Sequence, residues 1–408
     1  LDLKQRRFTP WPDEGEITSP LENELFRIQK ENRVDYAGTL CGRPVGLYDG
    51  NGYKILVTKG PDFIEGADGD PSFLVEFFSN LLGKGANDPL WDIQFRTFCQ
   101  WLKRFRCAMR NPQDHLPGQM LGLVGPKDVG KTLGQDIISR CLGGRSADPS
   151  LWLQGRSTFN GEMWCAEHLI LSDANLEDDP RHRQLFRDKL KEIVANSTYP
   201  LHRKGKDVII ARPVWRITLS ANDDPDSGFI LPALDDNNGD KIIYLKVYPP
   251  PVPFPTGSEF EYPAFYRKLV DAVPAFVKFI DGAECPEELR KGRFGIREFH
   301  HPGILDLINA HNPNTEFAEH LETWMDGWIP VTTAEKSLAA GELYMALAGH
   351  RWGVFKNICK SPKHLGHLMR KLSTSPGWQG RIIKETRRIG VNRSEHTAWR
   401  ILKNQPQN

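Results

Sequence analysis

The residues best suited to carry chemistry form a glycine-containing run from Gly125 to Thr132. The run reads Gly-Pro-Lys-Asp-Val-Gly-Lys-Thr and matches the phosphate-loop pattern GxxxxGK[ST]. In such a loop the backbone N–H groups face a β-phosphate, Lys131 reaches the β- and γ-phosphates, and the Thr132 hydroxyl can ligate Mg²⁺. The alternative is an ordinary glycine turn. The candidate nucleotide-binding residues are Gly125, Pro126, Lys127, Asp128, Val129, Gly130, Lys131 and Thr132.

The segments around this run have the order that a phosphate loop requires. Residues 120–124, MLGLV, predict a buried strand, and apolar residues recur at helical spacing from 133 to 142. Short apolar runs alternate with helical segments over 119–248, which is typical of an α/β fold. Upstream, residues 92–109 predict an amphipathic helix that packs beside this domain, with these basic residues on its other faces: Arg96, Lys103, Arg104 and Arg106.

Two further strands end in polar residues that suit the same chemistry. Residues 168–172 predict a buried strand that leads to Asp173, a candidate ligand for Mg²⁺ and a group that could polarise water. The alternative is that Asp173 only caps the following helix. Residues 214–220 predict another strand, followed by Asn222, which could hydrogen-bond the γ-phosphate or the attacking water. The alternative is that Asn222 is only a turn residue.

A basic segment lies between these two strands. Residues 199–211 contain two short extended stretches around a glycine-containing tip, which predicts a hairpin. A basic tip is often no more than a solvated loop. Its position inside the α/β segment weighs against that reading for His202, Arg203, Lys204 and Lys206.

In this order, the four motifs resemble those of the superfamily 3 helicases, which are AAA+ ATPases of viruses, phages and plasmids. The helix at 92–109 and the sequence Asp-Lys-Ile-Ile-Tyr-Leu at 240–245 look like the helicase half of phage and plasmid primase-helicases. The resemblance covers about residues 90–300. It implies an AAA+ P-loop NTPase core, ATP and Mg²⁺ as cofactors, and a hexameric ring. It also implies that one DNA strand is pulled through the pore, usually 3′ to 5′, gripped by the hairpin tip.

The sequence departs from the family at two places. The family often has paired carboxylates where this chain has Ser172 before Asp173, so the catalytic base is open, with Glu177 as one candidate. The family tends to place an arginine finger shortly after the asparagine strand, where this chain has Lys241. A lysine neutralises charge but cannot donate two parallel hydrogen bonds. Either Lys241 acts as the finger, or Arg187 reaches across the subunit interface.

The carboxyl end of the chain has a local excess of basic over acidic residues. Residues 351–403 contain 13 Lys and Arg and 2 acidic residues, while the remaining chain contains 40 and 50. Ser361 and Pro362 open a helix, preceded by a helix at about 334–348 and followed by a predicted hairpin, and this order resembles a winged helix. The alternative is a structural cap with a solvated basic face. The candidate DNA-binding residues are Lys363, His364, His367, Arg370, Lys371, Arg387, Arg388 and Arg393.

These patterns divide the chain into parts and limit its class. We expect a helical and small-β region at 1–110, the ATPase core at 111–257, a helical region at 258–328 and a winged-helix domain at 329–408. No run approaches the ~18 apolar residues of a membrane helix. Seven dispersed cysteines and no visible signal peptide favour the cytoplasm of a bacterial host or phage-infected cell. A primase or polymerase domain upstream of Leu1 is compatible with the resemblance.

The sequence therefore predicts an ATP-dependent DNA helicase that acts on single-stranded and forked DNA during replication of a phage, plasmid or mobile element. An alternative keeps the ATPase but uses it as a switch in an origin-binding initiator or loader that does not unwind. A signalling or remodelling AAA+ protein that does not bind DNA is more distant, because the basic carboxyl end argues against it.

Overall fold

The computed structural model describes residues 20–402, except 51, 113, 115, 173–179, 225–230, 233, 235–237, 252–260, 291–293, 311–312, 328–334, 351–354, 357, 374–377, 379 and 390–393. The chain divides into two compact units. One unit comprises Leu1–Ala221 and Asp236–Phe299, and the other comprises Asn222–Asp235 and His300–Asn408. In the part of the chain that is described, no helix is long and apolar enough to cross a bilayer.

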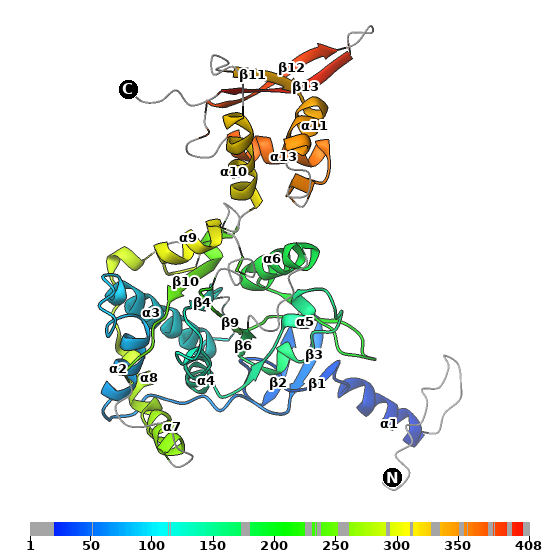
Figure 1. Cartoon of the computed structure of the whole chain (residues 1–408). Coiled ribbons are helices and arrows are strands. Elements are labelled where there is room, and N and C mark those ends of the chain that lie inside the picture. The colour runs from blue at the N-terminus through cyan, green and yellow to red at the C-terminus, as the bar shows by residue number, and fades with distance from the viewer. Residues whose placement is uncertain are drawn as a thin grey trace. The chain divides into compact units, whose positions relative to one another are not determined.

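A parallel five-stranded sheet forms the centre of the first unit (Figure 1). Its strands, in spatial order, are β10 (Ile242–Lys246), β4 (Met120–Val124), β9 (Arg216–Ala221), β6 (His168–Ser172) and β5 (Ser146–Ala147). All of β4 and β9 is buried, as expected for interior parallel strands that are covered on both faces. The expected α/β class is therefore observed.

The first unit also contains helices, several of which connect or cover these strands. They are α1 (Pro20–Glu31), α2 (Ser72–Leu81), α3 (Trp91–Arg110), α4 (Lys131–Cys141), α5 (Ser150–Leu153), α6 (Pro180–Ala195), α7 (Glu261–Asp271) and α8 (Val273–Gly282). Short 3₁₀ turns are η1 (Met163–Cys165), η4 (Gly239–Lys241) and η5 (Glu287–Leu289). The predicted helix at 92–109 is confirmed as α3.

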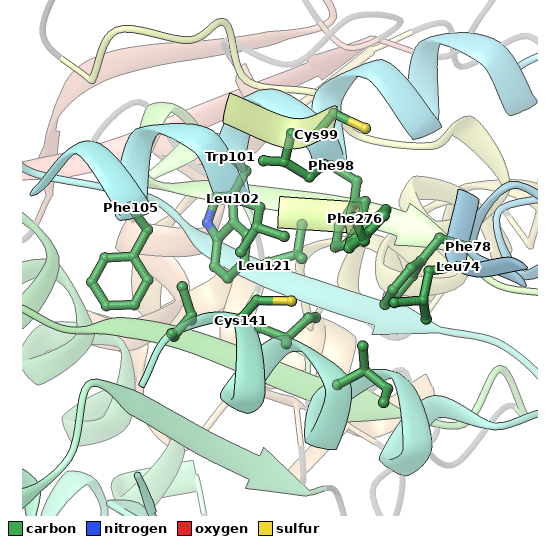
Figure 2. Packing of buried hydrophobic residues seen from close by; sticks show 14 of the residues in the cluster. Leu74, Phe78, Phe98, Cys99, Trp101, Leu102, Phe105, Leu121, Cys141 and Phe276 are labelled. Atoms are coloured by element: carbon green, nitrogen blue, oxygen red, sulfur yellow. The ribbon is translucent and has the colours of Figure 1, made fainter. Parts of the chain in front are cut away.

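The main core lies where α2, α3 and α8 meet α4 and the sheet (Figure 2). Phe78 of α2 stacks on Phe98 of α3 at 4.5 Å and on Phe276 of α8 at 5.5 Å between ring centroids. Each buried aromatic side chain contributes about 1.5–3 kcal/mol to the free energy of unfolding. The helices before and after the loop-bearing segment thus share one core with β4 and α4.

One basic residue of α3 lies on the buried side, contrary to the expectation that all four face away from the apolar stripe. The side chain of Arg106 is fully buried and donates to both carboxylate oxygens of Asp281, at 2.9 Å each. It also donates to the carbonyl oxygens of Cys141 and Ile64. Burial of this charge is tolerated because a carboxylate and two carbonyls satisfy it.

A small three-stranded sheet precedes α2. Its strands are β1 (Tyr36–Gly38), β2 (Gly46–Gly50) and β3 (Tyr53–Val57), in the order β1-β3-β2. β2 and β3 pair antiparallel, which confirms a small β unit in the amino-terminal region. Ile55 of the central strand β3 pairs with Tyr36 of β1 and with Tyr48 of β2. Residues paired across neighbouring strands point to the same face, so these three side chains share one face of the sheet.

The second unit combines helices with an antiparallel sheet. It contains α9 (Pro302–Ala310), α10 (Pro313–Asp326), β11 (Glu335–Ala339), α11 (Ala340–His350), α13 (Pro362–Ser373), β12 (Ile382–Ile389) and β13 (Ser394–Leu402). The sheet order is β11-β13-β12. The expected helix at 334–348 is wrong in its first part, because residues 335–339 pair with β13 and only 340–350 are helical.

Candidate functional site

The glycine-containing loop begins directly at the end of β4, where only glycine fits. Gly125 N–H donates to the carbonyl oxygen of Ala221, the last residue of β9, at 3.2 Å. A Cβ at position 125 would lie 2.1 Å from the carbonyl oxygen of Val247, just beyond β10. The loop therefore leaves the sheet between two strand ends that hold its first residue in place.

The rest of the loop curls over the start of α4. Asp128 and Gly130 have φ values of 61° and 95°, in the left-handed region that reverses the chain direction. Val129 is buried and anchors the loop, whereas Pro126, Lys127 and Asp128 are exposed. The turn sets the loop amides and the positive end of α4 beside an accessible surface, which is the arrangement that binds phosphate.

Lys131 folds back over this loop. Its Nζ donates to the carbonyl oxygens of Gly125 and Pro126, at 2.7 Å each. These contacts hold the ammonium group at the loop mouth, where phosphate oxygens would be stronger acceptors than neutral carbonyls. Thr132 is exposed at the second position of α4. All eight sequence-predicted loop residues thus lie in one turn between the end of β4 and the start of α4.

The carboxyl ends of three neighbouring strands meet at this edge. Val124 of β4 lies beside Ala221 of β9, and Ser172 of β6 lies beside Ser220. Asn222 follows β9 directly and is half-buried. Asp173 and Glu177 lie outside the described residues. In the sheet, only β9 separates β6, the strand that leads to Asp173, from β4, the strand that leads to the loop.

A buried polar network beneath the loop was not anticipated from the sequence. His168 Nε2 lies 2.9 Å from Thr218 Oγ1, and His168 Nδ1 lies 2.7 Å from Ser139 Oγ. Gln135 Nε2 donates to Thr218 Oγ1 at 2.8 Å, and Ser139 Oγ donates to the carbonyl oxygen of Gln135 at 3.0 Å. The network ties the helix that follows the loop to the two strands that carry Asp173 and Asn222.

The hydrogen bonds of this network determine the tautomer of His168. Ser139 uses its proton on Gln135, so it accepts from His168 Nδ1, and Thr218 donates to His168 Nε2. Complete burial lowers the pKa of His168 from 6.5 to about 3. His168 is therefore neutral, and each member of the network has a partner. A sequence signal was available, because a polar histidine opens an otherwise apolar strand.

The candidate finger Lys241 lies at the end of η4, immediately before β10. Its Nζ donates to Asp240 at 2.8 Å, and its side chain is 12% exposed. Helix α6 contacts η4. Arg187 belongs to α6, but its side chain lies outside what the structure describes. The two finger candidates therefore sit on elements that touch each other.

The predicted hairpin at 199–211 is confirmed as β7 (Tyr199–Leu201) paired antiparallel with β8 (Ile209–Ala211). Its tip residues Lys204 and Lys206 are exposed. His202 and Arg203 are half-buried, and the His202 ring lies 4.9 Å from that of Phe159. The four predicted residues therefore differ in burial, with two exposed cations at the tip and two half-buried groups at its base.

In the second unit, α13 separates an apolar face from a basic one. Leu365, Leu368, Met369 and Leu372 are buried in the core of this unit, and the exposed basic side chains are Lys363, His367, Arg370 and Lys371. The predicted cap is confirmed, because His364 N–H donates to Ser361 Oγ at 3.2 Å. Burial is the main cause that lowers the pKa of His364, and the nearby His367 and Lys360 lower it further.

The predicted wing residues are only partly described. Arg387 and Arg388 lie in β12, opposite His396 and Glu395 of β13. Their side chains, and Arg393 as a whole, fall outside the described residues.

Comparisons with known proteins find the same overall fold in one set of solved structures. No family model and no curated protein matches the sequence. The apo structure of the NrS-1 C-terminal region matches with a TM-score of 0.53 at 13% identity, covering 94% of this chain and 90% of that chain. The A form apo structure of that region gives a TM-score of 0.52 at 12% identity over the same shares. A JCV helicase matches only with a TM-score of 0.29, too low to carry an argument. The chain therefore shares the fold of the NrS-1 C-terminal region.

Proposed function

We propose that this chain is an ATP-dependent DNA helicase that translocates on single-stranded DNA during replication of a phage, plasmid or mobile element. One observation carries the proposal. A single compact unit combines a phosphate loop at the carboxyl edge of a parallel sheet with a hairpin that presents Lys204 and Lys206 at its tip. The first feature suits ATP hydrolysis, and the second couples it to a DNA backbone.

The loop fits a nucleoside triphosphate with Mg²⁺. The left-handed Gly130, the loop amides before α4 and the ammonium group of Lys131 supply the donors and the charge that hold β- and γ-phosphates in such loops. In this proposal Lys131 exchanges its loop carbonyls for phosphate oxygens. Thr132 and Asp173 would hold Mg²⁺, which neutralises charge on the phosphates. Asn222 would orient the attacking water.

We further propose that the active unit is a hexameric ring in which a neighbouring subunit completes each site. The candidates for the residue acting in trans are Lys241 and Arg187. Contact between α6 and η4 supports their belonging to one surface of the unit. A cation acting in trans stabilises the charge that develops on the transferred phosphoryl group.

The carboxyl unit is proposed to be a winged helix. The order of helices and strands from α10 to β13, with β12 and β13 as a hairpin, supports this reading. The basic face of α13 would enter a major groove, and the hairpin arginines would hold phosphates.

A second candidate is an origin-binding initiator or loader that uses ATP as a switch. The separate basic unit favours it, because a helicase that only translocates does not require such a unit.

Strand displacement distinguishes the two functions. A duplex with a single-stranded tail is incubated with the chain, ATP and Mg²⁺, and released strand is measured for 3′ and 5′ tails separately. The helicase proposal requires ATP-dependent release that stops with a non-hydrolysable analogue. ATP hydrolysis without release on either tail would replace it with the loader.

A further inference from the structure

Arg203, at the base of the hairpin tip, is held in a fixed place by a residue from the amino-terminal sheet. Its guanidinium carbon lies 4.2 Å from the ring centroid of Tyr36 in β1. Tyr36 is only 3% exposed, so the ring is itself rigidly packed. A guanidinium over an aromatic face gains a cation–π interaction and loses freedom to rotate.

The loop that precedes η1 also contacts Arg203 and the base of the hairpin. A Cβ at Gly161 would lie 2.6 Å from Arg203 Cγ, so the arginine stem packs directly on that glycine. Asn160 clamps the base of the hairpin: its Oδ1 accepts from His202 N–H and its Nδ2 donates to the carbonyl oxygen of Pro200, both at 2.8 Å. Tyr36, Gly161 and Asn160 therefore all contact the base of the hairpin tip.

Arg203 has no carboxylate partner among the residues that the structure describes, and its buried Nε has no hydrogen-bond acceptor there. Nearby Arg145 differs, since it pairs with the buried Glu167. Because Arg203 is only half-buried and lacks a carboxylate partner, an anion from solution can reach it and satisfy its charge. Phosphate matches it best, because two of its oxygens can accept from one guanidinium.

We propose that Arg203 is a preoriented ligand for one backbone phosphate of single-stranded DNA, and that Tyr36 is the positioning residue that orients it. The inference rests on the proposed function, in which the hairpin contacts DNA. It adds the small amino-terminal sheet to the DNA site. Lys204 and Lys206 then supply exposed charge at the tip, while Arg203 supplies a preoriented contact.

The same sheet offers a matched control. Arg43 lies over Tyr48 with its guanidinium carbon 5.8 Å from the ring centroid, and Tyr48 occupies the same row of the sheet as Tyr36. Arg43 also has a buried nitrogen, Nη1, without an acceptor among the described residues, but it is only 6% exposed, so DNA cannot reach it. Tyr48→Leu therefore removes a similar stack that has no role in binding.

The experiment measures binding of a labelled oligothymidylate to the full chain at several salt concentrations. We expect Arg203→Ala to weaken binding about tenfold and to reduce the slope of log K against log [salt] by about 0.7, the value for one phosphate of a single strand. Tyr36→Leu should weaken binding about threefold with the slope unchanged, whereas Tyr36→Phe and Tyr48→Leu should bind as the parent does. Gly161→Ala should resemble Tyr36→Leu, because it displaces the arginine stem.

A double variant separates positioning from general damage. Tyr36→Leu combined with Arg203→Ala should bind no more weakly than Arg203→Ala alone, because Tyr36 acts only through Arg203. Additive losses, or equal losses in Tyr36→Leu and Tyr48→Leu, would overturn the positioning role. An unchanged slope in Arg203→Ala would overturn the phosphate contact. If Lys204→Ala with Lys206→Ala also left binding unchanged, the proposed DNA function of the hairpin would be the part that failed.

Discussion

At the scale of single residues, the candidate site depends on backbone conformations and on the ammonium group of Lys131. Gly125 leaves no room for a side chain, and Gly130 adopts a left-handed conformation that opens α4 toward the loop. Lys131 rests on two loop carbonyls in this arrangement. The loop is thus preformed, and in the proposed function we expect nucleotide binding to require a change in the partners of Lys131.

Lys131→Ala should lower steady-state ATP hydrolysis by about a thousandfold or more, since it removes the contact to the β- and γ-phosphates. The melting temperature should change little, because the hydrogen bonds of Lys131 to Gly125 and Pro126 stay within the loop and join no distant element. Phosphate release assays with and without DNA, together with thermal unfolding, check both expectations. Near-normal DNA-stimulated turnover would contradict the phosphate-loop assignment.

His168 should make stability depend on pH. Its pKa is about 3 in the folded state and near 6.5 when exposed, so below pH 6.5 the unfolded chain binds a proton that the folded chain does not. The free energy of unfolding contributed by His168 should therefore be complete above about pH 6.5 and fall toward pH 3, by up to about 1.4 kcal/mol per pH unit.

His168→Gln provides the comparison, because glutamine cannot gain a proton. Urea unfolding from pH 7 to pH 5 should show a shallower loss of stability in the variant than in the parent. Parallel curves would mean that His168 does not titrate on unfolding in this range.

At the scale of elements, the order of the strands brings the chemistry together. β9 lies between β4 and β6, so the ends of three strands that are distant in sequence reach one edge. The network of His168 and Thr218 joins two of these strands to α4. The hairpin β7–β8 follows α6 and presents its tip from the same unit.

Lys204→Ala with Lys206→Ala should keep basal ATP hydrolysis within about twofold and abolish strand displacement. The reason is that, in the proposed function, the tip contacts DNA and takes no part in holding the phosphates of the nucleotide. A matched control is Lys30→Ala with Lys59→Ala, which removes the same charge from exposed positions elsewhere. Strand displacement that survives in the tip variant, or is lost equally in the control, would exclude the hairpin as the coupling element.

At the scale of the whole molecule, the chain has two units with separate cores, and the proposal assigns a different function to each. The first buries a core around Trp101 and Phe276, and the second buries one around Phe355 and Trp399. The second unit carries the basic face of α13. We expect the first to hold ATP and single-stranded DNA and the second to bind duplex.

Mixing experiments test whether a ring shares its sites between subunits. If Lys241 acts in trans, Lys241→Ala should be inactive alone, and activity in mixtures with the parent should fall more steeply than the mutant fraction. Lys241→Arg should retain or raise turnover, because a planar guanidinium can bridge two phosphate oxygens.

The same titration with Arg187→Ala decides between the two finger candidates. A silent Lys241→Ala together with a poisoning Arg187→Ala would assign the finger to Arg187. If neither variant affects mixtures, sites are not shared between subunits and the ring proposal fails.

The sequence alone determined those features that arise from contacts between near neighbours in the chain. The phosphate loop, its flanking strand and helix, the β7–β8 hairpin and the Ser361 cap each depend on a few consecutive residues. Their residue types and spacing therefore predicted them. The sequence also placed the apolar stripe of α13 correctly, since a helical period is a local property.

Only the tertiary structure decided the features that depend on distant partners. Residues 335–339 have helix-forming neighbours, yet pairing with β13 makes them a strand. The sequence pattern places Arg106 on an outer face of its helix, whereas in the structure it is buried and paired with Asp281. The stack of Arg203 on Tyr36 and the network of His168 likewise join segments that no local pattern relates. In each case the deciding free energy comes from burial and hydrogen bonding between remote segments, which the spacing of residues does not encode.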